Sequence, residues 1–195
     1  MSARKLKPLL AAVCALLAAG AIGACGSSGS QTTTGTYAGE SGKNAPYLNV
    51  GPLVYQVQLS RALNPANAED AAYLQFLTPR QARLKPGEEW FAVFMQVRNP
   101  TGLPRPATAN IFLEDTQNNR YTQIVPPPAN LYAYRAEVVP ANSLIPVPGT
   151  PASHGPANGQ VLLFKIKTVS LNNRPIEVHI IDPLTGKEAR AILDV

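Results

Sequence analysis

The sequence contains few of the residues that carry most catalysis and metal binding. Its 195 residues include two cysteines and two histidines. His154 lies in a proline-rich stretch, and His179 lies on a strand face that we expect to point outward. Ser153 precedes His154, but adjacency in sequence does not set the geometry of a nucleophile and its base. We therefore predict surface roles for both histidines, no catalytic residues, and a protein that is not an enzyme.

The same scarcity argues against a bound metal or other cofactor. The histidines and sulfur atoms do not supply a zinc or copper ligand set. The chain also has no glycine-rich phosphate loop and no dinucleotide-binding fingerprint. Acidic pairs at 69–70, 88–89 and 114–115 could form a weak calcium site if their loops converged. Because adjacent residues of a strand point to opposite faces, solvated charge is the favoured interpretation.

The chain lacks a basic stripe. Its formal net charge of +5 includes Arg4, Lys5 and Lys7 at the amino end. Without these three residues, 14 basic and 12 acidic residues remain, a net charge of +2. The remaining basic residues are scattered among acids, which is typical of a solvated surface. We therefore predict that nucleic acid is not the partner.

Residues 1–24 have the pattern of a helical export signal. A basic start precedes the apolar run LLAAVCALLAAGAIGA, which is too short to span a bilayer comfortably. Ile22, Gly23 and Ala24 then precede Cys25, and this order resembles the bacterial lipobox. The resemblance implies that Cys25 receives a diacylglyceryl thioether and becomes the first residue of the mature protein. The alternative is an ordinary secretory signal that is cleaved near a cysteine.

Lipidation of Cys25 would anchor the exported protein to the outer face of the cell membrane. Since Cys14 lies inside the leader, the mature chain keeps one cysteine and forms no internal disulfide. Residues 25–46 are rich in Gly, Ser and Thr and show no hydrophobic period, so a flexible, disordered linker is predicted there. The folded domain is expected to occupy 47–195, about 150 residues, which suffices for one core.

Hydrophobic alternation predicts an all-β domain organised around residues 88–122. Residues 90–97 carry apolar side chains on both faces, which is typical of a central strand covered on both sides. Asn118 and Asn119 tolerate the positive dihedral angles of a tight hairpin turn. The count and alternation favour antiparallel pairing in two packed sheets, a β-sandwich of about seven strands. Strands are predicted at 54–60, 90–97, 108–114, 121–125, 160–168, 175–182 and 188–195.

Three details of this prediction concern faces and connections. In the first strand, alternation places Leu59 on the same face as Tyr55 and Val57. The connection 61–86 contains a short helix that Asn67 would cap. The connection 126–158 holds eight prolines, and it is either a crossing with a short strand near 144–147 or a functional loop.

The chain carries the motifs PGEEW at 86–90, VRN at 97–99, FLED at 112–115 with RY at 120–121, and the segment 159–164. These motifs resemble a bacterial family of exported immunoglobulin-like domains, whose members are mostly lipoproteins or secreted antigens such as the immunoprotective extracellular antigen. The resemblance spans 47–195. A glycine often seen in the family's hairpin turn is here Asn119. The resemblance implies the sandwich fold and export, and it brings no catalytic residues.

These observations together favour a tethered binding or adaptor domain with an envelope protein as its partner. The predicted contact surface comprises Leu131, Tyr132, Tyr134 and Arg135, because tyrosine and arginine are frequent at interfaces. The alternative is that these aromatic residues pack over an open edge of the domain. A second functional hypothesis is an envelope accessory protein of a membrane complex that binds a metal or a small ligand.

Overall fold

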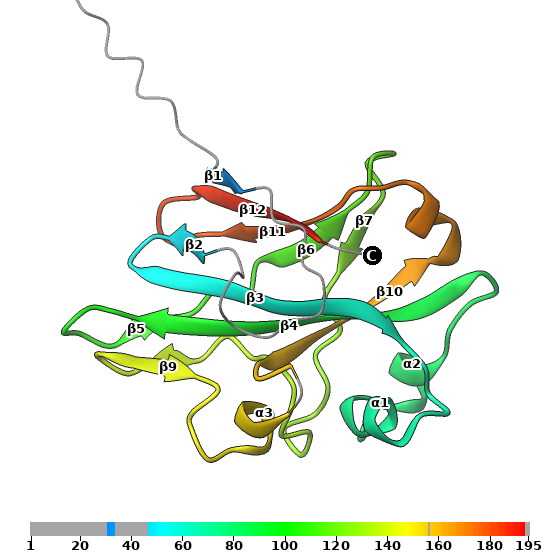
Figure 1. The fold of residues 1–195 in the computed structure, drawn as a ribbon, viewed down its shortest axis with the longest axis horizontal. Coiled ribbons are helices and arrows are strands. Elements are labelled where there is room, and N and C mark those ends of the chain that lie inside the picture. The colour runs from blue at the N-terminus through cyan, green and yellow to red at the C-terminus, as the bar shows by residue number, and fades with distance from the viewer. Residues whose placement is uncertain (1–30, 34–46, 156, 194–195) are drawn as a thin grey trace, which may run out of the picture.

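The computed structural model describes residues 31–33, 47–155 and 157–193, which form two sheets packed face to face (Figure 1). Except for the parallel pair of β1 and β12, neighbouring strands are antiparallel. This confirms the predicted all-β antiparallel sandwich. Sheet A has the order β1 (Gln31–Thr33), β12 (Glu188–Leu193), β11 (Ile176–Ile181), β6 (Ile111–Glu114) and β7 (Arg120–Thr122). Sheet B has the order β10 (Gln160–Lys167), β4 (Glu88–Asn99), β3 (Leu53–Leu63) and β2 (Tyr47–Val50), and β9 (Ser143–Ile145) also pairs with β4.

The remaining elements are short. A two-stranded sheet joins β5 (Arg105–Pro106) to β8 (Val138–Val139). The helices are α1 (Ala68–Tyr73), α2 (Pro79–Ala82), α3 (Pro151–His154) and the 3-10 helix η1 (Thr168–Asn172). Within the described residues, no helix is long and apolar enough to cross a membrane.

The amino-terminal predictions fall mostly outside the described residues. The signal peptide, the lipobox residues and Cys25 all lie in the part of the chain that is not described. Within the predicted linker, Gln31–Thr33 form β1 and pair with Ala189, Arg190 and Ala191 of β12. The prediction of a structureless linker is therefore wrong for these three residues.

The inner faces of both sheets form the main core. Phe91, Val93, Met95 and Val97 of β4 all point into it and are fully buried. From sheet A, Val178 of β11 and its neighbours face them. Burying one such side chain contributes roughly 1.5–3 kcal/mol, so this layer accounts for most of the cohesion between the sheets.

The outer face of sheet B carries a second cluster at one end. Trp90, Ala92 and Phe94 alternate with the core residues of β4 and pack beneath α1 and the segment after Pro126. The Tyr73 ring of α1 meets the Phe94 ring edge-on, with centroids 5.0 Å apart. Between Trp90 and Phe94, strand β4 is thus covered on both sides, as its two apolar faces predict.

A β-bulge redirects the end of β3. The register of β3 against β4 shifts between Val57 and Leu59, which leaves Gln58 as the extra residue. A shift of one residue reverses the face of each later side chain. Leu59 therefore packs against the second cluster, and the prediction that it shares the face of Tyr55 and Val57 is wrong.

The two predicted irregular connections have defined local structure. Asn67 caps α1, because its side chain accepts hydrogen bonds from the backbone N–H groups of Glu69 and Asp70. The proline-rich connection contains β9, which confirms a short strand close to the predicted position, and it also contains β8 and α3. The prediction of a strand from 108 is too long, since β6 begins at Ile111.

Candidate functional site

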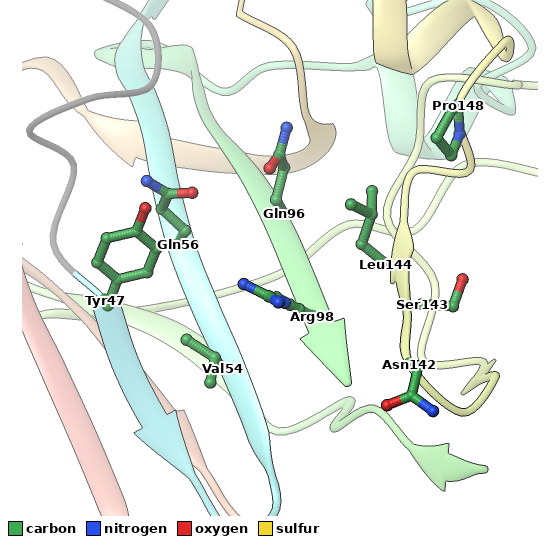
Figure 2. Close-up of a pocket in the computed structure, with 9 residues that line it drawn as sticks. All are labelled: Tyr47, Val54, Gln56, Gln96, Arg98, Asn142, Ser143, Leu144 and Pro148. Carbon is green, nitrogen blue, oxygen red and sulfur yellow. The ribbon is translucent and has the colours of Figure 1, made fainter. Parts of the chain in front are cut away.

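A hollow of about 460 Å³ lies on the outer face of sheet B, at the end opposite the second cluster (Figure 2). Its floor consists of two rows of side chains that the strand register places side by side. The first row is Tyr47, Gln56 and Gln96, and the second is Val54, Arg98 and Leu144. Asn142, Ser143 and Pro148 complete the wall. These nine residues define the Arg98 hollow.

The hollow exists because one face of β4 changes from apolar to polar side chains along the strand. The apolar residues Trp90 and Phe94 lie on the same face as Gln96 and Arg98. The apolar half is buried, whereas Gln96 is half-buried and Arg98 is exposed. Polar side chains do not drive the packing of a covering layer, so this half of the sheet remains accessible to solvent.

The wall that contains β9 is held from behind by Asn99, which is fully buried. The Asn99 Nδ2 donates to the carbonyl oxygens of Leu103, Val139 and Pro140 at 2.8, 2.9 and 3.0 Å. Its Oδ1 accepts from the backbone N–H and the hydroxyl of Thr101. A buried amide with all its hydrogen bonds made fixes both chain segments, so β9 keeps its position beside Arg98.

The lining of the Arg98 hollow contains one cation and no acid. Amide groups of Gln56, Gln96 and Asn142 and the hydroxyl groups of Tyr47 and Ser143 supply the other polar atoms. A second hollow of about 250 Å³ shares Gln96, Leu144 and Pro148 with the first and extends toward α3. The two adjoin at these shared residues, and their linings combine amide and hydroxyl groups with the apolar side chains of Leu144, Pro146 and Pro148.

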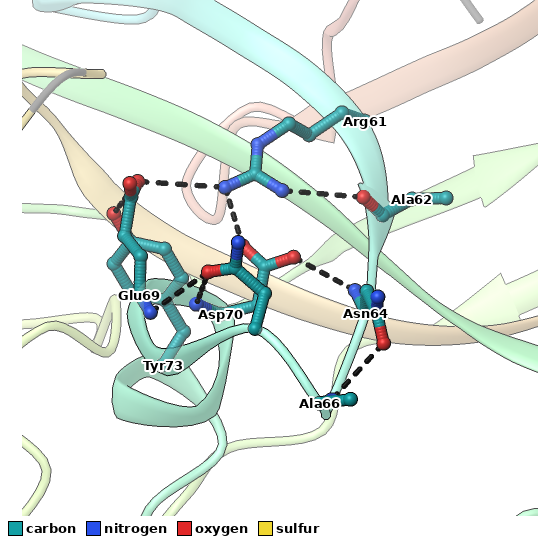
Figure 3. Close-up of polar contacts among 8 residues, drawn as sticks. Arg61, Ala62, Asn64, Ala66, Glu69, Asp70 and Tyr73 are labelled. Atoms are coloured by element: carbon teal, nitrogen blue, oxygen red, sulfur yellow. Dashed lines mark hydrogen bonds and ion pairs between the residues drawn. The ribbon is translucent and has the colours of Figure 1, made fainter.

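The covered end of the same face is held by an ion pair, shown in Figure 3. The Arg61 Nη2 of β3 lies 2.5 Å from the Asp70 Oδ1 of α1, and the backbone N–H of Asn64 donates to the Asp70 Oδ2 at 2.7 Å. The hydrogen bond from Arg61 lowers the pKa of the buried Asp70 carboxyl below its ordinary value. This arrangement anchors α1 to the end of β3, and we assign it a structural role.

The predicted contact surface at 131–135 is corrected by the burial of its members. Leu131 is exposed, but Tyr132 is half-buried against Tyr73, with ring centroids 5.3 Å apart. Tyr134 is fully buried, so it cannot contact a partner. Arg135 donates to carbonyl oxygens of its own connection, including that of Pro126 at 2.8 Å. The packing interpretation of these aromatic residues therefore holds for Tyr132 and Tyr134.

Tyr134 belongs to a buried hydrogen-bond network between the sheets. Its hydroxyl donates to the carbonyl oxygen of Thr108 at 2.7 Å. The backbone N–H of Thr108 donates to the Tyr55 hydroxyl at 2.8 Å. Burial raises the pKa of both tyrosine hydroxyl groups, most strongly that of Tyr134. Both hydroxyls therefore stay protonated, and they fix the chain where it enters β6.

His179 is buried, which corrects the prediction of a surface side chain. Its ring stacks on Phe112 with centroids 4.6 Å apart, and Glu177 and Glu188 lie at its two nitrogens. It faces outward from sheet A as predicted, but the long side chains of its neighbours cover it. The contacts of His179 are those of a packed cross-strand cluster.

His154 and Ser153 have local partners within α3. The Ser153 hydroxyl donates to the carbonyl oxygen of Thr150 at 2.8 Å, and the His154 Nδ1 lies 3.0 Å from the same oxygen. His154 is exposed, as predicted. The Ser153 Oγ also lies 3.0 Å from the His154 Nδ1, so the two side chains and the Thr150 carbonyl oxygen form one local cluster at the start of α3. Among the described residues, no carboxylate contacts the His154 ring to orient it as a base.

The acidic pairs do not converge. Glu69 and Asp70 face Arg61, and Glu114 pairs with Arg120 at 3.1 Å. Asp115 accepts hydrogen bonds within the hairpin turn. No group of three or more His, Cys, Asp or Glu side chains suited to a metal ion occurs in the described residues.

No family model matches the chain, and no curated protein matches it. Among solved structures, the yjhA protein from Bacillus subtilis gives a TM-score of 0.50 at 10% identity, over 80% of this chain and 99% of that one. An uncharacterised β-sandwich protein from Clostridium difficile 630 gives 0.43 at 7% identity, over 84% and 97% of the two chains.

A further similar structure is a "putative lipoprotein (ycdA)" from Bacillus subtilis, with a TM-score of 0.44 at 7% identity. The match covers 76% of this chain and 38% of the ycdA chain, so the chain spans well under half of that protein. The likeness to yjhA shows a shared sandwich fold and nothing about function. The resemblance to an immunoglobulin-like antigen family stays a prediction, since no family model supports it.

Proposed function

We propose that the protein is an exported lipoprotein, held at the outer face of the cell membrane by lipid on Cys25. The observation that carries this proposal is the order of Ile22, Gly23, Ala24 and Cys25 at the end of a basic and apolar leader. Each residue type suits the processing chemistry, because small side chains admit the backbone to a peptidase and the thiol accepts the lipid. Two or more acyl chains give stable membrane anchoring.

The folded part is proposed to act as a non-catalytic binding or adaptor module at the cell envelope. The Arg98 hollow supports this role, since it combines a solvent-accessible guanidinium with amide groups on a sheet whose end Asn99 ties to the segment before β9. A rigid sheet positions polar groups better than a mobile loop does. The small-ligand form of the accessory-protein hypothesis is compatible with the same site.

The proposal that the module is not an enzyme has support from the surroundings of its histidines. His179 is packed between Phe112 and two glutamates, and His154 shares a carbonyl oxygen with Ser153. His179 is therefore inaccessible to a substrate, and no described carboxylate orients the exposed His154 ring beside Ser153.

The anchoring proposal is tested by replacing Cys25 with serine in the full-length protein, in cells fed an alkyne-tagged fatty acid. We expect the wild-type protein to incorporate the tag and to sediment with membranes. Cys25→Ser should lose the tag, because serine cannot form the thioether. Cys14→Ser, a matched change within the leader, should keep both properties. Tagging of Cys25→Ser at the wild-type level would refute the anchor.

A further inference from the structure

The Arg98 side chain has the geometry of a carboxylate receptor. It is exposed on β4, and Figure 2 shows its guanidinium turned toward β3, within the hollow. Among the residues that the structure describes, none forms a hydrogen bond or ion pair with this side chain. Since the hollow has no acidic lining residue, no described wall group competes for the guanidinium. A guanidinium binds a carboxylate through two parallel hydrogen bonds.

The charge of the hollow matches one carboxylate better than a phosphate group. A phosphate monoester carries about −1.5 to −2 charges and three acceptor oxygens, and phosphate-binding sites commonly use several cationic groups. The Arg98 hollow offers one cation, and the remaining polar groups are neutral amides and hydroxyls. One guanidinium balances one carboxylate, so a singly charged organic anion is the favoured ligand.

Gln96 adds a second element of recognition beside Arg98. The two residues are two positions apart on the same face of β4, which separates their Cα atoms by about 7 Å. The Gln96 Nε2 donates to the carbonyl oxygen of Asn158 at 2.6 Å. This bond orients the amide and leaves its Oε1 as an acceptor for an N–H group of a ligand.

We propose that the Arg98 hollow binds the free carboxyl end of a short peptide, an inference that rests on the proposed binding function and specifies its ligand. Arg98 would hold the terminal carboxylate, and the Gln96 oxygen would accept a backbone N–H group of the peptide. Val54 and Leu144 flank Arg98 in register and provide apolar contact for side chains. The adjoining hollow beyond Gln96 gives the preceding residues of the peptide a place to lie.

The test uses full-length protein in mild detergent and two probes, N-acetyl-alanyl-alanine and its carboxyl-terminal amide. Binding is followed by chemical shifts of backbone amides in proton–nitrogen NMR spectra. We expect saturable shifts at residues 96–98 and 143–144 with the free acid. The amide should bind at least about tenfold more weakly, because it lacks the charge that Arg98 recognises. Equal binding of the two peptides would overturn the proposal, as would no saturable shift with either.

Variants of Arg98 test whether this residue binds the peptide, and their melting temperatures show whether the substitution also affects folding. Arg98→Gln should reduce binding of the acid at least about tenfold without changing the melting temperature, because the exposed side chain has no described partner to lose. Arg98→Lys keeps the charge but not the paired donors, so it should bind with intermediate affinity. Arg83→Gln removes an exposed arginine outside the hollow and should bind like the wild type. Unchanged binding by Arg98→Gln would contradict the assignment.

Inorganic phosphate serves as the competing oxyanion. At equal concentration it should displace little of the bound acid, whereas stronger binding of phosphate than of peptide would make the hollow a phosphate site and refute the proposal. The result is independent of anchoring, since binding is measured on purified protein and fatty-acid tagging is measured in cells. A failed peptide titration therefore leaves the Cys25 proposal intact, and a failed tagging experiment leaves the peptide proposal intact.

Discussion

The hairpin between β6 and β7 depends on one ionised carboxylate, and this gives a quantitative prediction. The Asp115 Oδ1 accepts from the backbone N–H groups of Gln117 and Asn119, each at 2.9 Å, and the Asn119 Nδ2 lies 2.9 Å from the Oδ2. Burial alone raises the pKa of Asp115, but hydrogen bonds from Ser170, Asn119 and Gln117 outweigh it and lower the pKa to about 2. The ionised form of Asp115 is therefore more stable in the folded state than in the unfolded chain.

The lowered pKa converts directly into a pH-dependent stability. A fall from the ordinary value of 3.8 to about 2 corresponds to about 2 kcal/mol of stabilisation at neutral pH. Because the folded-state pKa is the lower one, this contribution is complete above about pH 5 and is lost as the pH falls toward 2. At pH 3, about half of it remains.

Replacing Asp115 with asparagine removes the charge and turns an acceptor into a donor that faces the Asn119 amide. We expect Asp115→Asn to lower the free energy of unfolding by about 2 kcal/mol at pH 7, as measured by urea denaturation followed by tryptophan fluorescence. The difference from wild type should shrink to about half at pH 3. Glu114→Gln, the matched control, alters an ion pair with the largely exposed Arg120 and should cost under about 1 kcal/mol. A difference that is equal at both pH values would refute the assignment of the stabilisation to ionised Asp115.

Two further predictions concern packing. Tyr134→Ala should lower the free energy of unfolding by about 3–5 kcal/mol, because it empties a fully buried site, whereas Leu131→Ala should change it by under about 0.5 kcal/mol. Similar values for the two variants in thermal melts would contradict the packed position of Tyr134. Gly159→Ala should cost about 1–3 kcal/mol, since its Cβ would lie 2.8 Å from the backbone nitrogen of Met95. Gly102→Ala, where no atom lies within 4 Å of the added Cβ, is the control, and equal stability of the two alanine variants would contradict the close approach of β10 to β4.

Alternation of apolar and polar residues predicts which face of a strand is buried, as long as the pairing with the neighbouring strands continues without a register shift. Strand β4 is the best example, since its two apolar faces indicate burial on both sides and the structure confirms it between Trp90 and Phe94. The prediction fails at Leu59, because a single bulge at Gln58 exchanges the two faces of the strand. No residue type marks this bulge, since it arises from pairing with β4 and not from local chain preference.

Burial of polar and aromatic side chains is harder to predict from the sequence. Tyr134 lies in a proline-rich connection that lacks periodicity, yet its hydroxyl meets Thr108 in the core. His179 occupies an outward-facing position, and its burial depends on Phe112 and Glu188 from neighbouring strands. In both cases the partners lie far away in sequence, so local pattern cannot reveal them.

One feature of the Arg98 hollow can be predicted from the sequence. On the face of β4 that starts with Trp90 and Phe94, the sequence changes to Gln96 and Arg98. This change from apolar to polar along a single face indicates that a covering layer ends partway along the strand. The pairing of β9 beside Arg98, which completes the hollow, follows from a connection of more than 40 residues and is not visible in the alternation.

The arginines on the outer faces of the two sheets differ in whether a carboxylate pairs with them, and this favours sheet B as the binding face. On sheet A, Arg120 lies 3.9 Å from the Phe112 ring centroid and pairs with Glu114, while Arg190 lies between Glu177 and Glu188. An anion that approached these arginines would have to displace an existing carboxylate, and the exchange would gain little. On sheet B, Arg98 faces neutral polar groups among the described residues, so a ligand carboxylate gains the full interaction.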